Sequence, residues 1–136
     1  MAVTPGMTLE GKLAFATGRH REDDAYKLAL YGPTASLNAF TASYTKEGEC
    51  AGKGYAAGGQ ILQGYDVGIE GVTAVVTWTK ETLWKNASIT ARSGLVYNAR
   101  TGISVMVLDI VDEQGNQVTS TNGNFKVEGG IACWIG

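Results

Sequence analysis

The sequence predicts an all-β protein, a jelly roll or β-sandwich of about eight short strands with one short N-terminal helix and a long glycine-rich loop. Three observations predict this fold class. Short alternating or apolar segments recur at spacings of roughly 8 to 12 residues, with turn residues between them. Only one segment has helical spacing. The chain contains 19 glycines among 136 residues, which is about twice the usual share of about 7%.

The first elements along the chain are the helix and one strand. Residues 7–17 have apolar side chains at helical spacing and are followed by Gly18, a typical helix stop. The apolar positions are Leu9, Leu13 and Ala16. Residues 25–31 alternate, which indicates a half-buried strand. Its inward side chains would be Tyr26, Leu28 and Leu30, opposite Lys27 and Ala29.

Residues 32–59 form the long glycine- and alanine-rich segment, GPTASLNAFTASYTKEGECAGKGYAAGG. Structureless loops longer than about 12 to 15 residues are uncommon in compact domains. We therefore expect this segment to be a working surface or to be ordered by a partner. Residues 60–71 then predict two short extended pieces, broken at Gly64 and Gly68.

The remaining strands follow from β-branched runs and turn signals. Residues 72–78, 88–98 and 103–111 are each predicted to be a strand, and the last of these to be buried on both faces. On the first, Val72, Ala74, Val76 and Trp78 share a face. Turns are expected at residues 98–102, 112–116 and 120–124, the last because of its Asn122-Gly123 pair. Short strands are expected at residues 117–119, 125–128 and 131–135, the last as a sheet edge.

Length and composition favour a single domain spanning residues 1–136, with residues 1–6 as a possible N-terminal arm. The formal net charge is only −2, from 11 basic and 13 acidic residues mixed along the chain. That balance argues against direct nucleic-acid binding. No apolar run approaches the length of about 20 residues that spans a bilayer, so no membrane partner is expected. Cys50 and Cys133 are interpreted as free thiols.

Catalytic chemistry is not indicated. His20 is the only histidine, and its polar surroundings GRHREDD predict an exposed ring rather than part of a triad or zinc site. The carboxylates cluster where turns are expected. We therefore expect no enzyme activity, no catalytic residues, no cofactor and no metal. An acidic glycosidase pair stays open, because sequence does not give the separation of carboxylates.

The aromatic residues leave a second alternative, a carbohydrate-binding sandwich with a stacking platform. Trp84 lies in the polar stretch ETLWKNAS and is expected to be half-exposed there. Trp134 lies on the expected edge strand, where a neighbouring subunit could cover it. The simpler interpretation is that most of these rings fill the core.

Five segments follow one another in a recognisable order. They are ALYGPTASLNAF, TASYTKEGECAGKGYAAGGQIL, LWKNASITARSGLVYN, VMVLDIV and STNGNFKVE. In this order they resemble a group of small virion proteins of tailed bacteriophages, and the resemblance covers roughly residues 28–127. Within that group, the size and the all-β pattern are similar to jelly-roll capsid cement, or decoration, proteins such as that of a Bordetella podovirus. Residues up to Asp24 do not match the pattern.

The resemblance implies a non-enzymatic virion protein that binds the outside of a phage capsid and cements neighbouring capsomers. Its partner would be the major capsid protein, on the capsid surface of a virion made in the bacterial cytoplasm. A homodimer is expected through the edge strand at residues 131–135. The residues expected at interfaces are Leu37, Phe40, Tyr44, Tyr55, Trp84, Ile131 and Trp134. A neck or tail position in the virion remains an alternative.

Overall fold

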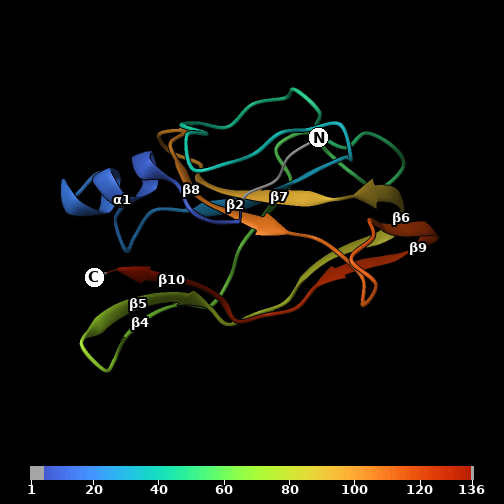
Figure 1. Cartoon of the computed structure of the whole chain (residues 1–136). Helices are drawn as coiled ribbons and strands as arrows, with labels where there is room; N and C mark the ends of the chain where they lie inside the picture. Colours follow the sequence, from blue (N-terminus) through green and yellow to red (C-terminus); the bar gives the residue numbers. More distant parts are fainter. Residues whose placement is uncertain (1–4, 136) are drawn as a thin grey trace.

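Two layers of antiparallel strands face each other across an apolar core (Figure 1). The computed structural model describes residues 5–135. One layer is a five-stranded sheet in the order β1-β8-β7-β2-β3, and the other contains a three-stranded sheet, β10-β5-β4, and a two-stranded ribbon, β6-β9. The elements are β1 (Gly6–Met7), α1 (Leu9–Ala16), β2 (Tyr26–Tyr31), β3 (Gln60–Ile61), β4 (Tyr65–Glu70), β5 (Thr73–Trp78), β6 (Thr82–Ala91), β7 (Ser93–Asn98), β8 (Ser104–Asp109), β9 (Val118–Val127) and β10 (Ile131–Ile135). With 47% strand and 6% helix, the all-β sandwich is confirmed.

The central strands of the five-stranded sheet are buried on both faces. Leu28 and Leu30 of β2 point into the main core between the layers. Ala29 and Tyr31, on the opposite face, belong to a second core. The prediction of a half-buried strand is therefore wrong for β2, because residues 32–59 return over the outer face and cover it. Residues 103–111 are predicted to be a strand buried on both faces, and this prediction is confirmed over most of β8.

Helix α1 and its end at Gly18 are confirmed, but its buried face differs from the expected one. Leu9 and Leu13 are half-exposed, whereas Gly11 and Ala14 are buried against β8. A side chain on Gly11 would collide with the carbonyl oxygen of Val105. Small residues thus let the helix lie close to the sheet. Residues 1–4 of the expected arm lie outside the described residues, and the remainder leads into β1, which pairs with β8.

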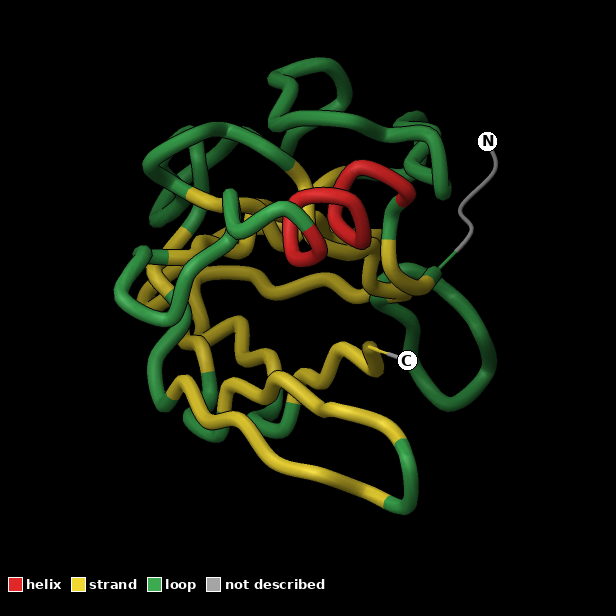
Figure 2. The backbone as a smooth tube through the Cα atoms, turned by 90° about the vertical axis from the view of Figure 1, so that its left-hand side faces the viewer, coloured by secondary structure: helices red, strands yellow, loops and turns green. Residues whose placement is uncertain are grey.

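Strands β4 and β5 form a hairpin that extends beyond the other layer (Figures 1 and 2). The predicted break at Gly64 is confirmed, but β4 runs through Gly68 without interruption. Of the four residues expected on one face of β5, Val76 and Trp78 are buried, whereas Val72 and Ala74 are exposed. Val72 and Ala74 are exposed because the end of the β4–β5 hairpin extends past the five-stranded sheet and is not covered by it.

The chain crosses from one layer to the other at Arg92. Residues 88–98 therefore do not form one strand as predicted but the end of β6 and the whole of β7. The predicted turn at residues 120–124 is also wrong, since β9 is continuous from Val118 to Val127. Asn122, with φ 51°, lies in a bulge of β9, and Asn86, with φ 50°, lies in a bulge of β6. Each bulge adds one residue to its own strand, so the two register shifts cancel. The left-handed conformation of Asn122 therefore belongs to a bulge and not to a hairpin turn.

Candidate interaction surface

Residues 32–59, which we call the covering segment, lie over the outer face of the five-stranded sheet (Figures 1 and 2). Short bridges pair Tyr31 with Glu49 and Ser43 with Ile103. The backbone N–H of Cys50 donates to the Leu30 carbonyl at 2.9 Å. Although the segment has almost no regular secondary structure, its backbone is thus fixed to the sheet at several points. It is an ordered surface layer, not a slack loop.

Glu49 is the organising residue of the covering segment. One carboxylate oxygen accepts a hydrogen bond from the Tyr44 hydroxyl at 2.6 Å. The other accepts from the Tyr55 hydroxyl at 2.5 Å and from the Gly58 N–H at 2.8 Å. Burial, and then the hydrogen bond to Glu49, raise the pKa of the Tyr44 and Tyr55 hydroxyls well above their usual range. Both therefore remain protonated donors at neutral pH.

Tyrosine rings and an apolar side chain fasten the covering segment to the sheet below it. The rings of Tyr44 and Tyr97 stack with centroids 4.7 Å apart. The Tyr97 hydroxyl donates to the Gly58 carbonyl at 2.7 Å. Leu37 is buried in the same small core. Three of the residues expected at an interface, Leu37, Tyr44 and Tyr55, thus support the surface from within and do not project from it.

The remaining expected interface residues divide by exposure. Phe40 is 79% exposed and Trp134 is 51% exposed, so both can contact a partner. Ile131 is buried in the main core. Trp84 is only 1% exposed, so the expectation of a half-exposed ring is wrong. The stretch around it is a strand and not a loop, and strand alternation turns Trp84 inward, where it packs against Tyr55 and Phe125.

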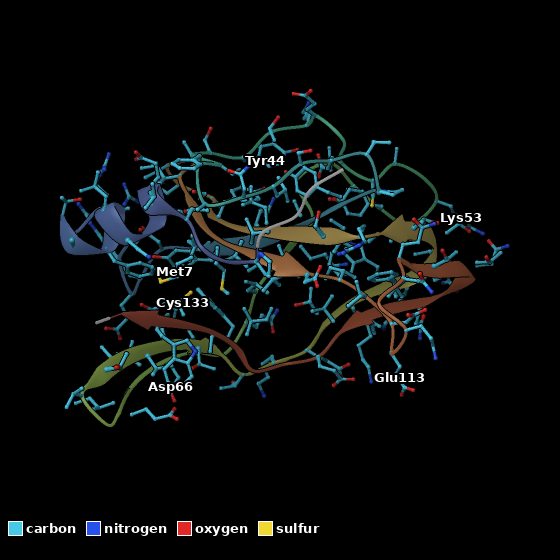
Figure 3. All side chains as sticks on the ribbon, in the orientation of Figure 1. Met7, Tyr44, Lys53, Asp66, Glu113 and Cys133 are labelled. Carbon is cyan, nitrogen blue, oxygen red and sulfur yellow. The ribbon has the colours of Figure 1, made fainter. Side chains whose placement is uncertain are left out.

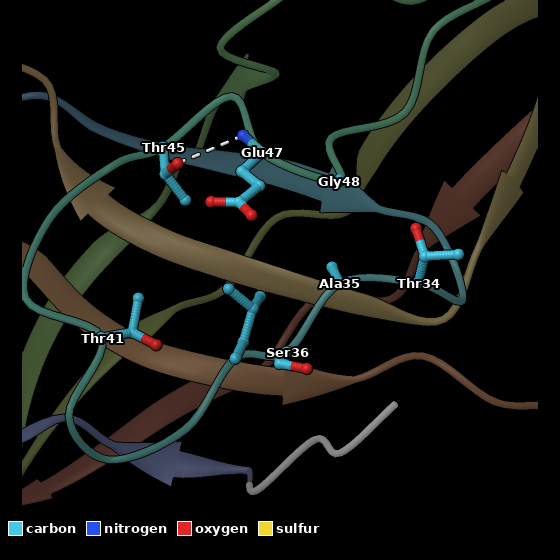
Figure 4. A pocket seen from close by; sticks show the side chains of 8 residues that line it. Thr34, Ala35, Ser36, Thr41, Thr45, Glu47 and Gly48 are labelled. Atoms are coloured by element: carbon cyan, nitrogen blue, oxygen red, sulfur yellow. Dashed lines mark hydrogen bonds between the residues drawn. The ribbon is translucent and has the colours of Figure 1, made fainter.

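The covering segment also forms an open surface pocket that sequence reasoning missed (Figure 4). Its volume is about 450 Å³. The lining residues are Thr34, Ala35, Ser36, Leu37, Thr41, Thr45, Glu47 and Gly48. All eight residues come from the covering segment. They lie together because the chain folds back between Gly32 and Gly48, where the Gly32 N–H donates to the Gly48 carbonyl at 2.9 Å.

The projecting β4–β5 hairpin forms a second exposed surface. Val67 and Ile69 alternate along β4 on one face, and both are exposed together with Val72 at the turn. The neighbouring edge strand β10, with sequence IACWI, carries no charge and no proline. Its register with β5 is continuous, without a bulge. Edge strands are usually protected by one of these features, and the described residues of β10 show none of them.

His20 is buried, which corrects the expectation of an exposed ring. Its Nε2 lies 2.9 Å from the Ser104 carbonyl oxygen, so Nε2 carries the proton because a carbonyl only accepts. The Asn98 side-chain amide donates to Nδ1 at 3.2 Å. Burial lowers the pKa of His20. The neutral ring thus has both nitrogens satisfied.

Asp24 continues this polar network. It accepts from the Asn98 amide at 2.8 Å and forms a two-point pair with Arg100, at 2.7 and 3.0 Å. The hydrogen bond from Arg100 holds the pKa of the Asp24 carboxyl well below its usual range. The charge run GRHREDD therefore anchors the segment after α1 to the turn between β7 and β8. No local sequence signal pointed to this, because the partners lie more than 70 residues away.

The described residues contain no group of three or more His, Cys, Asp or Glu side chains that could hold a metal ion. Figure 3 shows Lys53, Asp66 and Glu113 in separate parts of the molecule. Both cysteines are free, as expected, and burial raises the pKa of the Cys50 thiol to about 11 and that of Cys133 to about 12. Between residues 5 and 135, no helix has the length and apolar character needed to cross a bilayer.

Comparisons of the chain with protein-family models, with curated proteins and with solved structures give no match.

Proposed function

We propose that this protein is a non-enzymatic structural protein of a bacteriophage virion that binds the outside of the capsid and cements neighbouring capsomers. The observation that carries the proposal is the covering segment. It contains the SLN, YTKEGE and GKGYAAGG elements of the pattern on which the resemblance rests, and hydrogen bonds to Glu49 hold it in order on the sheet. A surface that is ordered before binding loses little conformational entropy on docking.

A cementing role needs contacts but no chemistry. Capsomers meet at fixed distances, so a rigid sandwich that carries separate contact surfaces can span a joint between them. The covering segment and the projecting β4–β5 hairpin belong to opposite layers of the sandwich. Each contact can be weak, because a protein bound at two places gains affinity from the high effective concentration of the second contact.

Self-association through β10 is part of the proposal. Two copies of this strand can pair antiparallel about Cys133, which would place Trp134 opposite the partner's Ala132. A large and a small side chain then face each other on the exposed side. The other edge of this sheet, β4, carries Asp66 and Glu70, and symmetric pairing there would place like charges together. We therefore expect a homodimer joined at β10.

Hydrogen exchange on free protein and on assembled particles tests the capsid role. We expect added protection of backbone amides in the covering segment on particles, with the exposed amides of β9 as the internal control. Equal exchange in both states would exclude the covering segment as the docking surface. Electron microscopy of particles labelled at the C-terminus then separates a capsid position from a neck or tail position by copy number and location.

The carbohydrate-binding alternative loses its best candidate residue, because buried Trp84 cannot stack on a sugar. Phe40 and Trp134 are the exposed rings, and they come from different layers of the sandwich. A glycan array probed with the intact protein tests what remains of this alternative. A hit that survives both Phe40→Ala and Trp134→Ala would require a different site.

A further inference from the structure

We propose that the pocket of the covering segment is a receptor for the side chain of a lysine or arginine, with Glu47 as its counter-ion. This deepens the proposed function and rests on it for the source of that side chain, the protein surface on which the covering segment docks. The affinity of the pocket for a basic group can be measured on the isolated protein.

Charge is the first reason. Glu47 is the only charged residue in the pocket lining. Figure 4 shows its carboxylate directed into the space between Thr45, Thr41 and Ala35. Within residues 5–135, no cation lies within ion-pair distance of this carboxylate. The pocket therefore carries one carboxylate, solvent-exposed and without a partner cation among the described residues, which suits a ligand with one positive charge.

The chemistry of the walls is the second reason. Leu37 and Ala35 are buried and form the apolar floor of the pocket, against which the end of the hydrocarbon stem of a long basic side chain can lie. Four hydroxyl side chains surround it, from Thr34, Ser36, Thr41 and Thr45. Hydroxyl oxygens accept hydrogen bonds from ammonium or guanidinium donors. A pocket of about 450 Å³ is large enough for a whole side chain of either kind.

The walls are also fixed in place before any ligand arrives. The Thr45 hydroxyl accepts the N–H of Glu47 at 3.1 Å, and the Thr41 hydroxyl accepts the N–H of Asn38 at 3.0 Å. The adjacent Glu49 network anchors the end of the pocket at Gly48. The site therefore does not have to be ordered by its ligand, and this ordering favours binding.

Other ligand classes fit the lining less well. Calcium takes six to eight oxygen ligands and prefers several carboxylates, whereas the pocket offers one. Sugars are commonly held against an aromatic face, and no aromatic ring lines the pocket. A single monovalent cation with an aliphatic stem uses the carboxylate, the hydroxyls and the apolar floor together.

The test is a titration of the ¹⁵N-labelled protein with n-butylammonium and with N-acetyl-arginine amide, followed through the amide signals of Thr45 and Gly48. Uncharged n-butanol is the ligand control. Glu113→Gln is the matched control variant, since Glu113 is an exposed carboxylate in the turn after β8. We expect saturable shifts with both cations, and about fivefold weaker binding by Glu47→Gln, the upper range of a surface ion pair. Glu113→Gln should bind like the wild type.

The inference is overturned by an absence of saturable shifts with both cations, by n-butanol binding as tightly as n-butylammonium, or by Glu47→Gln binding as tightly as Glu113→Gln. Its failure is distinguishable from failure of the proposed function. Binding of the cations without binding of the protein to capsids would leave the pocket assigned and remove the cement role. Capsid binding with no response to the cations would do the opposite.

Discussion

The Tyr44 hydroxyl lies 2.6 Å from a carboxylate oxygen of Glu49, five residues further along the chain, and this contact holds the covering segment in shape. The same carboxylate accepts from Tyr55 and from the Gly58 amide. Glu49→Ala removes the acceptor of all three donors. We expect the free energy of unfolding to fall by about 2 to 4 kcal/mol, since each part-buried donor left unpaired costs about 1 kcal/mol or more. Urea unfolding measures this.

Glu47→Ala is the matched control for Glu49. It removes a carboxylate from the same segment, two residues away, but that carboxylate accepts no hydrogen bond among the described residues. Its unfolding free energy should change by less than about 0.5 kcal/mol. Equal losses for the two variants would mean that net charge, and not the Glu49 hydrogen bonds, determines the stability of the segment.

Trp84 and Trp134 should respond differently to truncation. Trp84 is fully buried between Tyr55 and Phe125, so Trp84→Ala should lower the free energy of unfolding by about 3 to 5 kcal/mol. Trp134→Ala, measured on dilute monomer, should cost less than about 1 kcal/mol because half of the ring is already exposed.

Trp84→Phe keeps an aromatic ring at this position and removes the indole N–H, which has no hydrogen-bond partner in the described part of the chain. It should cost clearly less than Trp84→Ala. A stable Trp84→Ala protein would contradict the buried position of this ring.

His20 should make the protein less stable in mild acid. Its pKa is lowered in the folded state, mainly by burial, while the unfolded chain has the ordinary value of about 6.5. As the pH falls below about 6.5, the unfolded state takes up a proton that the folded state resists, so the free energy of unfolding falls by at most about 1.4 kcal/mol per pH unit. This contribution is fully present above the unfolded pKa.

Urea midpoints between pH 7.5 and pH 5 check the effect of His20. His20→Gln should flatten the profile in this window. The Asp24 carboxyl, whose pKa is also lowered, loses its contribution only in stronger acid, below the ordinary aspartate value of about 3.9. An unchanged pH profile in His20→Gln would assign the acid sensitivity to other groups.

The proposed dimer through the edge strand β10 can be tested with a charged substitution. Trp134→Lys places an ammonium group near the C-terminal end of β10, and natural edge strands use lysine in this way against pairing. We expect light scattering to change from dimer to monomer, with little loss of stability. Val72→Lys, at the fully exposed end of the β4–β5 hairpin, should remain dimeric. A wild-type protein that is monomeric at all concentrations would exclude the β10 dimer.

Local patterns predicted many elements because their causes are local. The stop at Gly18 ends α1 as expected, while the N-cap at Thr8 comes from the structure. Alternation placed β2 and β5 within a few residues, and apolar runs between turn signals did the same for β8 and β10. Asn122-Gly123 failed as a turn signal. The same left-handed asparagine that closes a tight hairpin also fits a β-bulge, and only pairing with β6 selects between them.

The sequence by itself determined the all-β class, the single short helix, the free cysteines and the presence of a long segment that needed a purpose. Tertiary structure alone decided the burial of the side chains that local patterns misplaced. Residues 32–59 cover the five-stranded sheet and thereby bury both faces of β2. Trp84 points inward because residues 82–91 form a strand. His20 is enclosed by the distant residues Asn98 and Ser104. Burial of a residue depends on which distant segment of the chain packs against it. The local periodicity of the sequence does not predict that packing partner. The Glu47 pocket has the same origin, because its lining residues come together only when the segment folds back on itself.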